Sequence, residues 1–379
     1  MMMVKSTLTD NSWYQVDNVA EISSPALLLF PGRIESNIQA MIKIAGKADR
    51  LRPHVKTHKS AEITRLQINA GICKFKCATV AEAEMVAMCG AKEVILAMQP
   101  VGPNSGRFFR LKQDFPETEF SCIADSEGVI RQLSDMAVKT GLKTGVWLDI
   151  NNGMNRTGIQ PGDDAAGLVQ KIADLPMLVP EGLHLHDGHI IEKDIAQRIK
   201  VCNDYFAPVA SLLEKLTNAG ISGLKIVAGG TSTFTVHALR KDMELECSPG
   251  TTLLWDYGYS SSFPDMEFLH AAVLLTRIIS KPAKDLICLD LGSKAVASEM
   301  PQPRIMIFGL DNYSIVTQSE EHMVIRTTEA DNLNIGDPLY GIPWHICPTV
   351  DRYDTVSVVR GGRVTEEWIV KARRRKITI

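Results

Sequence analysis

A repeated alternation of short apolar runs and helix-like segments constrains the fold of this chain more than any other feature. From residue 24 to about residue 250, runs typical of β-strands are separated by segments whose apolar residues recur at helical spacing. Eight runs qualify as strands at intervals that suit βα units: SPALLLF, LRPHVK, CKFKC, EVILAM, EFSCIA, GVWLDI, GLHLHD and LKIVAGG. That number predicts a (β/α)8 barrel rather than an open doubly wound sheet. A dinucleotide-binding fold is also disfavoured, because no GxGxxG fingerprint follows the first strand.

The pattern changes after about residue 268, where strand-like runs follow one another through tight turns. The stretch VSVVRGGRVTEEW is typical of a hairpin with a Gly-Gly turn. We therefore expect a barrel over residues 24–268 and an antiparallel β domain over residues 269–379. Residues 1–23 have no place in the barrel and are expected to join the β domain.

Composition excludes several classes of function. The 41 basic and 44 acidic residues leave a formal charge of −3, which argues against a general nucleic-acid binder. No run approaches the length of a membrane-spanning helix, and the first residues lack the apolar core of a signal peptide. We expect a cytoplasmic protein whose eight scattered cysteines are mostly buried thiols, with Cys347 considered separately.

The first candidate site residue is a lysine at the end of a strand-like run. In a barrel of this kind, functional side chains collect at the carboxyl ends of the strands. If RPHVK is extended, alternation places His54, Lys56 and His58 on one face. A lysine buried among such groups would have a lowered pKa and could form a Schiff base. Taken alone, these residues favour the alternative, a strand end with solvated charges.

Two further stretches follow predicted strands. In LDINNGMNRTG, Arg156 could hold an anionic phenolate or carboxylate, although a well-capped loop explains the pattern equally. In HLHDGH, His184 and His186 share a strand face. They could bind a metal, stack on a flat cofactor or be satisfied core histidines.

Two late stretches suit a phosphate group and a metal ion. AGGTSTF, paired with SPGTTLL, exposes successive backbone N–H groups and hydroxyls that could hold one phosphate. In HICPT, His345 and Cys347 would point the same way if the segment were extended, and their side chains suit Zn²⁺. A buried cysteine beside an edge histidine is the alternative.

Taken together, six motifs resemble those of the D-threonine aldolase and D-serine dehydratase family: LRPHVKTHK, DINNGMNRTG, HDGH, AGGTST, CSPGTTLLWDYGY and HICPT. That family consists of pyridoxal 5′-phosphate (PLP) enzymes with the alanine-racemase-like fold, fold type III. The resemblance covers nearly the whole chain in order, and it favours the aldolase branch.

The resemblance implies a role for each candidate residue of the barrel. Lys56 would bind PLP as a Schiff base and exchange protons at Cα. The expected alternation, rather than the resemblance, makes His54 and His58 able to tune its pKa. Arg156 would hydrogen-bond the phenolic oxygen of the cofactor, and His186 would face the pyridine ring. Five residues would hold the phosphate: Gly230, Thr231, Ser232, Gly250 and Thr251.

The resemblance also implies a divalent metal, Zn, Mn or Mg, bound by His345 and Cys347. A β-hydroxy-D-amino acid would bind that metal through its hydroxyl oxygen. Retro-aldol cleavage of a D-threonine-type substrate to glycine and an aldehyde is the expected reaction. D-serine or 3-hydroxy-D-aspartate dehydration, giving a 2-oxo acid and ammonia, is the alternative that the same residues could support.

One departure argues against an amino-acid racemase. Alanine racemases place an arginine against the pyridine nitrogen, at the position that Ser248 occupies here. A serine does not limit charge build-up in the ring, which suits a lyase better. A non-catalytic PLP carrier is a further alternative, disfavoured by the β domain and the metal pair. The resemblance also implies a homodimer and no membrane or nucleic-acid partner.

Overall fold

The computed structural model describes residues 12–379, and the chain forms two compact units. The barrel unit contains residues 38–56, 60–250 and 371–379, and the β unit contains the chain up to Asn37 with residues 57–59 and 251–370. Of the 23 residues expected to join the β domain, 1–11 lie outside the described part. Trp13 and Tyr14 pack in the apolar core of the β unit. The boundaries predicted at residues 24 and 268 stay a prediction.

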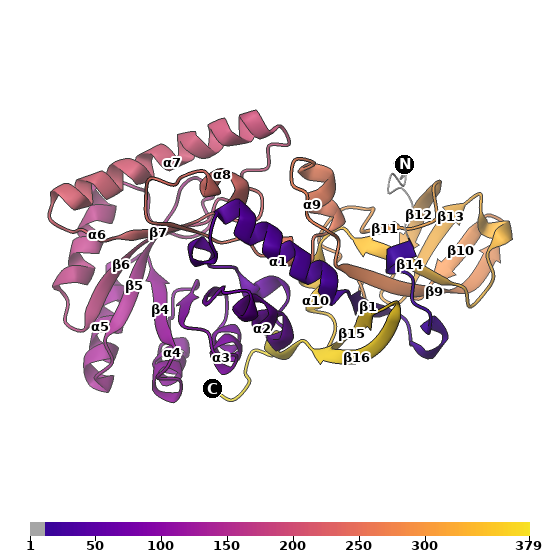
Figure 1. Cartoon of the computed structure of the whole chain (residues 1–379), viewed down its shortest axis with the longest axis horizontal. Helices are drawn as coiled ribbons and strands as arrows, with labels where there is room; N and C mark the ends of the chain where they lie inside the picture. The colour runs from indigo at the N-terminus through magenta and orange to yellow at the C-terminus, as the bar shows by residue number, and fades with distance from the viewer. Residues whose placement is uncertain (1–11) are drawn as a thin grey trace. The chain divides into compact units, whose positions relative to one another are not determined.

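The barrel unit is built on a parallel sheet of seven strands in the order β2 to β8 (Figure 1). Its strands are β2 Lys74–Cys77, β3 Glu93–Leu96, β4 Glu119–Ala124, β5 Thr144–Ile150, β6 Leu178–Leu185, β7 Lys225–Ala228 and β8 Leu245–Cys247. Its helices are α2 Ala61–Asn69, α3 Val80–Met88, α4 Pro103–Asp114, α5 Glu127–Thr140, α6 Asp163–Asp174, α7 Ile195–Asn218 and α8 Phe234–Ala238. The helix α1 Pro31–Ala45 runs from the β unit into the barrel unit. An alanine-racemase-like α/β barrel followed by a β domain is confirmed.

Local sequence signals set the ends of the helices. Before α3, the Thr79 hydroxyl accepts a hydrogen bond from Glu82 N at 3.1 Å, while the Glu82 carboxylate accepts one from Ala78 N at 2.6 Å. These bonds satisfy donors that a helix start leaves unpaired. The helix stops before Gly90, which has a φ of +91° that an L side chain rarely adopts.

An irregular stretch, Leu51–His54, lies between the first and last strands of this sheet. It forms single parallel bridges from Leu51 to Cys247 on β8 and from His54 to Lys76 on β2. Because Pro53 has no N–H, a regular ladder cannot run through the stretch. The extended chain ends at His54, and Val55–Thr57 form a 3₁₀ turn. The prediction that alternation places Lys56 and His58 on the face of His54 was therefore wrong.

The strand β1, Ala26–Leu29, was also predicted wrongly, as the first strand of the barrel. It pairs antiparallel with β9 and parallel with β15 in the sheet of the β unit. The run is apolar on both faces, and such a run indicates a buried strand without indicating which sheet buries it. The barrel strand that the sequence did not predict is β8, a short segment of three residues.

The β unit holds a nine-stranded, mainly antiparallel sheet. Besides β1, its strands are β9 Ala272–Ala283, β10 Leu286–Leu289, β11 Ile305–Ile307, β12 Tyr313–Gln318, β13 Met323–Thr327, β14 Pro338–Pro343, β15 Thr355–Arg360 and β16 Arg363–Ile369. Its own helices are α9 Tyr257–Ser262 and α10 Ile346–Val350. The predicted Gly-Gly hairpin joins β15 to β16, with positive φ at Gly361 and Gly362 of 56° and 77°.

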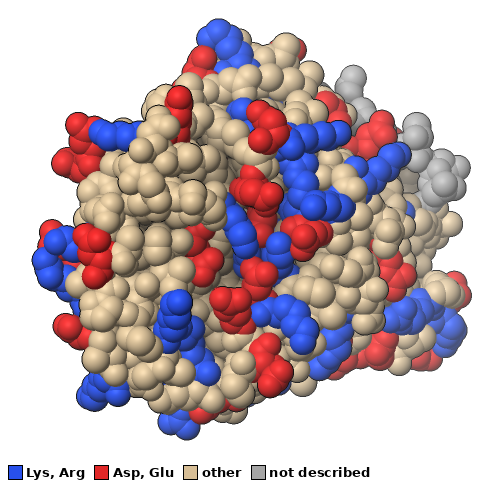
Figure 2. Space-filling view, turned by 60° about the vertical axis from the view of Figure 1, so that its left-hand side comes forward, with Lys and Arg blue, Asp and Glu red and all other residues tan. Residues whose placement is uncertain are grey.

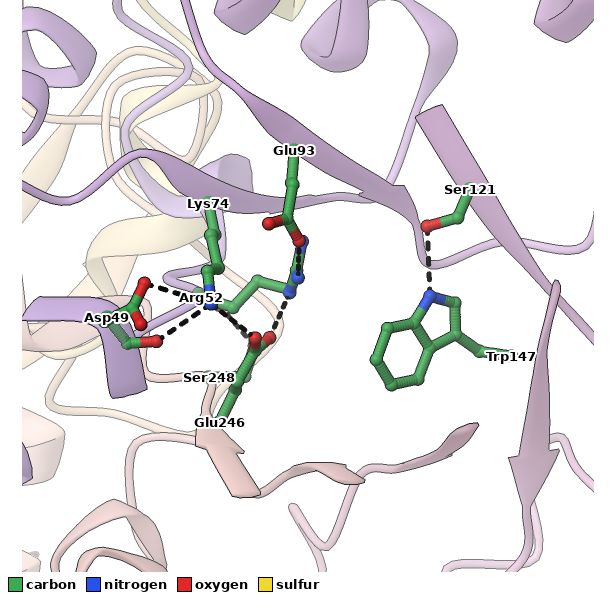
Figure 3. Close-up of polar contacts among 8 residues, drawn as sticks. All are labelled: Asp49, Arg52, Lys74, Glu93, Ser121, Trp147, Glu246 and Ser248. Carbon is green, nitrogen blue, oxygen red and sulfur yellow. Dashed lines mark hydrogen bonds and ion pairs between the residues drawn. The ribbon is translucent and has the colours of Figure 1, made fainter. Parts of the chain in front are cut away.

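A network of ion pairs centred on the buried side chains of Arg52 and Glu246 lies at the amino-terminal end of the barrel interior (Figure 3). The Arg52 guanidinium donates to Glu246 at 2.5 Å and to Glu93 at 2.6 Å, and only 1% of its side chain is exposed. Lys74 lies 2.9 Å from the other oxygen of Glu246 and 3.2 Å from Asp49. An apolar layer follows, formed by Ile95, Ile123, Trp147 and Val227. The mouth of the barrel therefore lies above a packed core.

The surface agrees with the balanced composition of the chain. In the face that Figure 2 shows, basic and acidic side chains are interspersed rather than gathered by sign. Among residues 12–379, no helix combines the length and the apolar character that crossing a bilayer requires. The absence of a nucleic-acid partner stays a prediction.

Replacing Arg52 tests the importance of this network for stability. In Arg52→Met, the carboxylates of Glu246 and Glu93 lose a buried cationic partner, and we expect the free energy of unfolding to fall by about 3 kcal/mol. Urea unfolding measures the loss. The control is Arg131→Met, which removes an exposed ion pair on α5 and should leave the midpoint nearly unchanged. Equal midpoints for the two variants would contradict a stabilising network.

Candidate active site and metal pair

Charged and polar side chains line the mouth of the barrel. Lys76 lies two residues beyond Lys74 on β2, and Asp149 and His184 lie side by side on β5 and β6. Since residues two apart on a strand share a face, these side chains point inward as Lys74 and Trp147 do. His184 Nδ1 lies 2.7 Å from Asp149 Oδ1. Within residues 12–379, His184 Nε2 is buried and has no hydrogen-bond partner.

Lys56 lies in the 3₁₀ turn that follows the Leu51–His54 stretch, and it is half-buried. His54 is buried beside it, and burial followed by the Lys56 ammonium holds the pKa of His54 well below its usual range. Burial, followed by the charge of Lys56, also lowers the pKa of Lys76 to about 7. His58 is buried in the β unit. The catalytic roles of Lys56 and His58 stay predictions.

The loop after β5 presents Arg156 to solvent. The Asn151 side-chain oxygen accepts hydrogen bonds from Gly153 N at 3.2 Å and from Asn155 N at 3.0 Å, which curls the loop. Gly158 returns the chain to β5: a Cβ there would lie 2.6 Å from Asn151 N, and its φ is +92°. The guanidinium is thus held on a tightly folded loop at a strand's carboxyl end.

The His186 ring lies against two glycines. A Cβ at Gly230 would lie 2.9 Å from His186 Cε1, and one at Gly188 would lie 2.7 Å from His186 Nε2. Burial, followed by the nearby charges of Lys76 and Lys56, lowers the pKa of His186 to about 3. The ring is therefore a neutral, flat group held between two backbone segments.

The predicted phosphate residues form two adjacent loops. The cradle loop, residues 229–232, follows β7, and the second segment follows β8. Gly250 N donates to Thr231 Oγ1 at 3.3 Å, which joins the two loops. Thr231 and Ser232 are buried, and Thr251 begins a 3₁₀ turn of the β unit. The geometry brings together Gly230, Thr231, Ser232 and Gly250. Their role in holding a phosphate stays a prediction.

His345 and Cys347 lie at the start of the helix α10, so the prediction that their segment is extended was wrong. His345 precedes the helix as its N-cap residue with φ −130°, and Cys347 lies in the first turn. Asp256 fixes this start, because its Oδ2 accepts a hydrogen bond from Ile346 N at 2.9 Å. The two side chains nonetheless contact each other, since they share a hydrogen bond.

The environment of the pair favours a thiolate beside a charged imidazole. Burial raises the pKa of Cys347, but the His345 ring and the hydroxyls of Thr251 and Thr57 hold it below its usual value. These hydroxyl oxygens lie 3.4 and 3.1 Å from the sulfur. Burial lowers the pKa of His345, but Cys347 and neighbouring carboxylates raise it to about 9. Glu299 Oε1 lies 2.5 Å from His345 Nδ1.

A second buried cluster was not predicted from the sequence. Asp187, Cys202 and His237 lie close together behind the cradle loop, and all three are at most 1% exposed. Asp187 Oδ2 lies 2.6 Å from His237 Nε2, which lies 3.5 Å from Cys202 Sγ. The aspartate of HDGH was a visible signal, but its partners come from α7 and α8, distant in the sequence.

Two known domain families and several known enzymes are similar to this chain. The model of the alanine racemase N-terminal domain matches residues 31–258, and a serine dehydratase domain matches residues 271–359. D-threonine aldolase of Arthrobacter sp. is 29% identical over 361 residues, covering 94% of both chains. 3-Hydroxy-D-aspartate aldolase of Paracoccus denitrificans is 28% identical over 387 residues, covering 96% of this chain and 98% of the relative.

Solved structures give the same result. The D-threonine aldolase structure from Filomicrobium marinum has a TM-score of 0.86 and 26% identity, covering 94% of this chain and 97% of that chain. D-threo-3-hydroxyaspartate dehydratase from Delftia sp. HT23 shares the fold, with a TM-score of 0.79 over 92% of this chain and 97% of that chain, at 20% identity. The chain belongs to the alanine racemase N-terminal domain family. The predicted resemblance to D-threonine aldolases and D-serine dehydratases is confirmed.

The pH dependence of stability tests the buried position of Lys76. Burial disfavours its charged form, so the folded protein binds fewer protons here than the unfolded chain between about pH 7 and the ordinary lysine pKa of about 10.4. The free energy of unfolding therefore rises with pH in this window through this residue. We expect Lys76→Met to reduce the rise, measured by urea unfolding at several pH values. The exposed-site control Lys143→Met should keep it, and equal slopes in both variants would contradict the assignment.

Proposed function

We propose that this protein is a PLP- and metal-dependent lyase that cleaves β-hydroxy-D-amino acids of the D-threonine type to glycine and an aldehyde. One observation carries the proposal: similarity to D-threonine aldolase extends over 94% of both chains. D-serine dehydratase of Dictyostelium discoideum is less similar, at 23% identity. Dehydration of D-serine or 3-hydroxy-D-aspartate is accordingly the second candidate.

The mouth of the barrel fits PLP. A Cβ at Gly230 would collide with the His186 ring, so glycine at this position lets the ring lie directly against the cradle loop proposed to hold the phosphate. Buried polar atoms without a partner among residues 12–379 include His184 Nε2 and Asn152 Oδ1, which a bound molecule could satisfy. PLP, when bound, supplies an electron sink for the bonds at Cα of an amino acid.

Each predicted residue then has a task that its chemistry suits. The Lys56 amine would hold the cofactor and would move the proton at Cα of a substrate. Arg156, on the loop after β5, would donate to a phenolic oxygen. His186 would face the pyridine ring. Gly230, Thr231, Ser232, Gly250 and Thr251 would hold the phosphate, although the N–H groups of Gly230 and Gly250 donate to the hydroxyls of Thr233 and Thr231.

The pair of His345 and Cys347 fits a divalent metal. An imidazole nitrogen and a thiolate suit Zn²⁺ better than Mg²⁺ or Mn²⁺. Glu299 against Nδ1 leaves Nε2 as the ligand atom, the usual arrangement around a metal-bound histidine. A metal here would polarise the β-hydroxyl of the substrate. Within the β unit, the Thr57 hydroxyl lies 3.1 Å from Cys347 Sγ, and Thr57 is the residue after Lys56 in the sequence.

Racemisation is disfavoured by the contacts of Ser248. Its hydroxyl donates to the carbonyl oxygen of Arg52 at 2.8 Å, as Figure 3 places these residues near one another. The serine proton is thus engaged and is not offered to a ring nitrogen. The arginine by which alanine racemases limit charge build-up in the ring is replaced here by serine. A cytoplasmic homodimer completes the proposal, and light scattering of the purified protein measures the subunit number.

Product analysis decides between the two lyase reactions. We expect glycine and acetaldehyde from D-threonine, with little pyruvate or ammonia from D-serine, in the presence of PLP and Zn²⁺ or Mn²⁺. Lys56→Ala should lose the visible absorption band of the bound cofactor and at least a thousandfold in kcat, about 4 kcal/mol in barrier height. Pyruvate and ammonia as the main products would establish the dehydratase instead. An unchanged band in Lys56→Ala would remove this lysine from the cofactor site.

Removing the metal pair tests its contribution. Each of His345→Ala and Cys347→Ser should lower the bound Zn²⁺, measured by elemental analysis, and reduce cleavage of D-threonine by a hundredfold or more. Binding of PLP, measured by absorption, should persist because its proposed contacts are untouched. The control Cys73→Ser changes a cysteine outside the pair. Full activity in the presence of a strong chelator would refute a role for the metal.

A further inference from the structure

Behind the cradle loop, three buried side chains form a connected set. Thr233 Oγ1 donates to Asp187 Oδ1 at 2.6 Å, and His237 Nε2 donates to Asp187 Oδ2 at 2.6 Å. Thr233, Asp187 and His237 are all completely buried. Both carboxylate oxygens of Asp187 are therefore occupied by side chains from the segment that follows β7.

The same side chains contact the cradle loop. Gly230 N donates to Thr233 Oγ1 at 3.2 Å. At Gly229, where φ is +86°, a Cβ would lie 2.9 Å from His237 Cδ2 and 3.2 Å from Thr233 Oγ1. The turn at residues 229 and 230 thus rests directly on the threonine and the histidine, at a spacing that leaves no room for a larger residue.

Together with His186, these contacts form a closed set of linked residues. Asp187 follows His186 in the chain, and the His186 ring lies against Gly230, as the 2.9 Å approach of a Gly230 Cβ shows. Gly230 bonds to Thr233, and Thr233 bonds back to Asp187. The cradle loop and the His186 ring are therefore linked through the hydrogen bonds of Thr233 and Asp187 and the peptide bond between His186 and Asp187.

Charge balance between Asp187 and His237 offsets part of the cost of burying them completely, while His237 Nδ1 has no hydrogen-bond partner among residues 12–379. Burial raises the pKa of Asp187, but His237 and the Thr233 hydroxyl hold it below its usual value, so it is an anion. Burial lowers the pKa of His237, but Asp187 raises it to about 9, so it is a cation. The pair is neutral overall, and its short bonds do not require a metal ion between the two side chains.

We propose that Asp187, Thr233 and His237 are positioning residues that hold the phosphate loop and the His186 ring in fixed relation to each other. This inference rests on the proposed function, because it assigns the phosphate of PLP to residues 229–232. None of the three side chains needs to touch the cofactor. They act through the backbone of Gly229 and Gly230 and through the chain bond between His186 and Asp187.

The sharpest test removes the link between the loop and the carboxylate without altering shape. Thr233→Val keeps the volume of the side chain but loses the hydroxyl shared by Gly230 N and Asp187. We expect PLP to bind about tenfold more weakly to this variant, measured by absorption titration of protein stripped of cofactor. The phosphorus NMR signal of bound PLP should also shift. Thr233→Ser retains the hydroxyl, and its dissociation constant should lie within about twofold of the wild-type value.

A matched control separates positioning from a general loss of stability. Thr118 is a buried threonine whose hydroxyl donates to Ala91 O at 2.8 Å, at the opposite end of β4. Thr118→Val should lower the melting temperature yet leave the PLP dissociation constant and the phosphorus signal unchanged. If Thr233→Val does not fold, Asp187→Asn tests the same link, with weaker PLP binding as the expected result.

The outcomes distinguish this inference from the function on which it rests. Wild-type protein that fails to bind PLP refutes the proposed function. If wild-type protein binds PLP, and Thr233→Val has the same PLP dissociation constant and phosphorus signal as wild type, the positioning network alone is refuted. Zn²⁺ binding gives a further test of the positioning network. The network would be refuted if the double variant His345→Ala/Cys347→Ser bound as much Zn²⁺ as wild type while His237→Gln bound none. Asp187, Cys202 and His237 would then be a metal site.

Discussion

Charge buried inside the parallel barrel is the constraint that the rest of this unit must meet. An unpaired guanidinium in a protein interior costs several kcal/mol of lost hydration. Arg52 avoids this cost through Glu246 on β8 and Glu93 on β3. Because it lies in the irregular stretch between β8 and β2, its ion pairs join strands on both sides of that stretch. The ion pairs of Arg52 therefore help to hold β8 and β3 together where Pro53 interrupts the backbone hydrogen bonding between strands.

Hydrogen bonds connect the ion pairs of Arg52 to the loops at the mouth of the barrel. Ser248, two residues after Glu246, donates to the Arg52 carbonyl, and Gly250 then bonds to Thr231 of the cradle loop. The cradle is in turn held by Thr233, Asp187 and His237. A chain of hydrogen bonds and ion pairs thus runs from the floor of the barrel to the loop proposed to hold phosphate. Such continuity suits a site whose groups must keep fixed positions.

Much of the fold followed from the sequence, but the sequence predicted eight barrel strands, whereas the sheet has seven strands and the irregular stretch Leu51–His54 between β8 and β2. The run at Ala26–Leu29 was counted although it lies in the other sheet, and the three-residue strand β8 was missed. Apolar runs report burial, and burial does not name the partner strand. The cluster of Asp187, Cys202 and His237 was out of reach for a related reason, because its members are brought together by α7 and α8 packing on the loop after β6.

The errors in local geometry fall at the positions proposed to be functional, and this has a physical cause. Lys56 lies in a 3₁₀ turn just after an extended stretch, and His345 and Cys347 lie where β14 gives way to α10. Periodicity predicts side-chain direction only inside a regular element. Reactive groups collect at element ends, where backbone donors are unpaired and loops can shape a site. Motif resemblance located these residues because it depends on their order and identity. Alternation instead assumed a regular backbone, and the extended backbone ends at His54 and at Pro343, two to four residues before them.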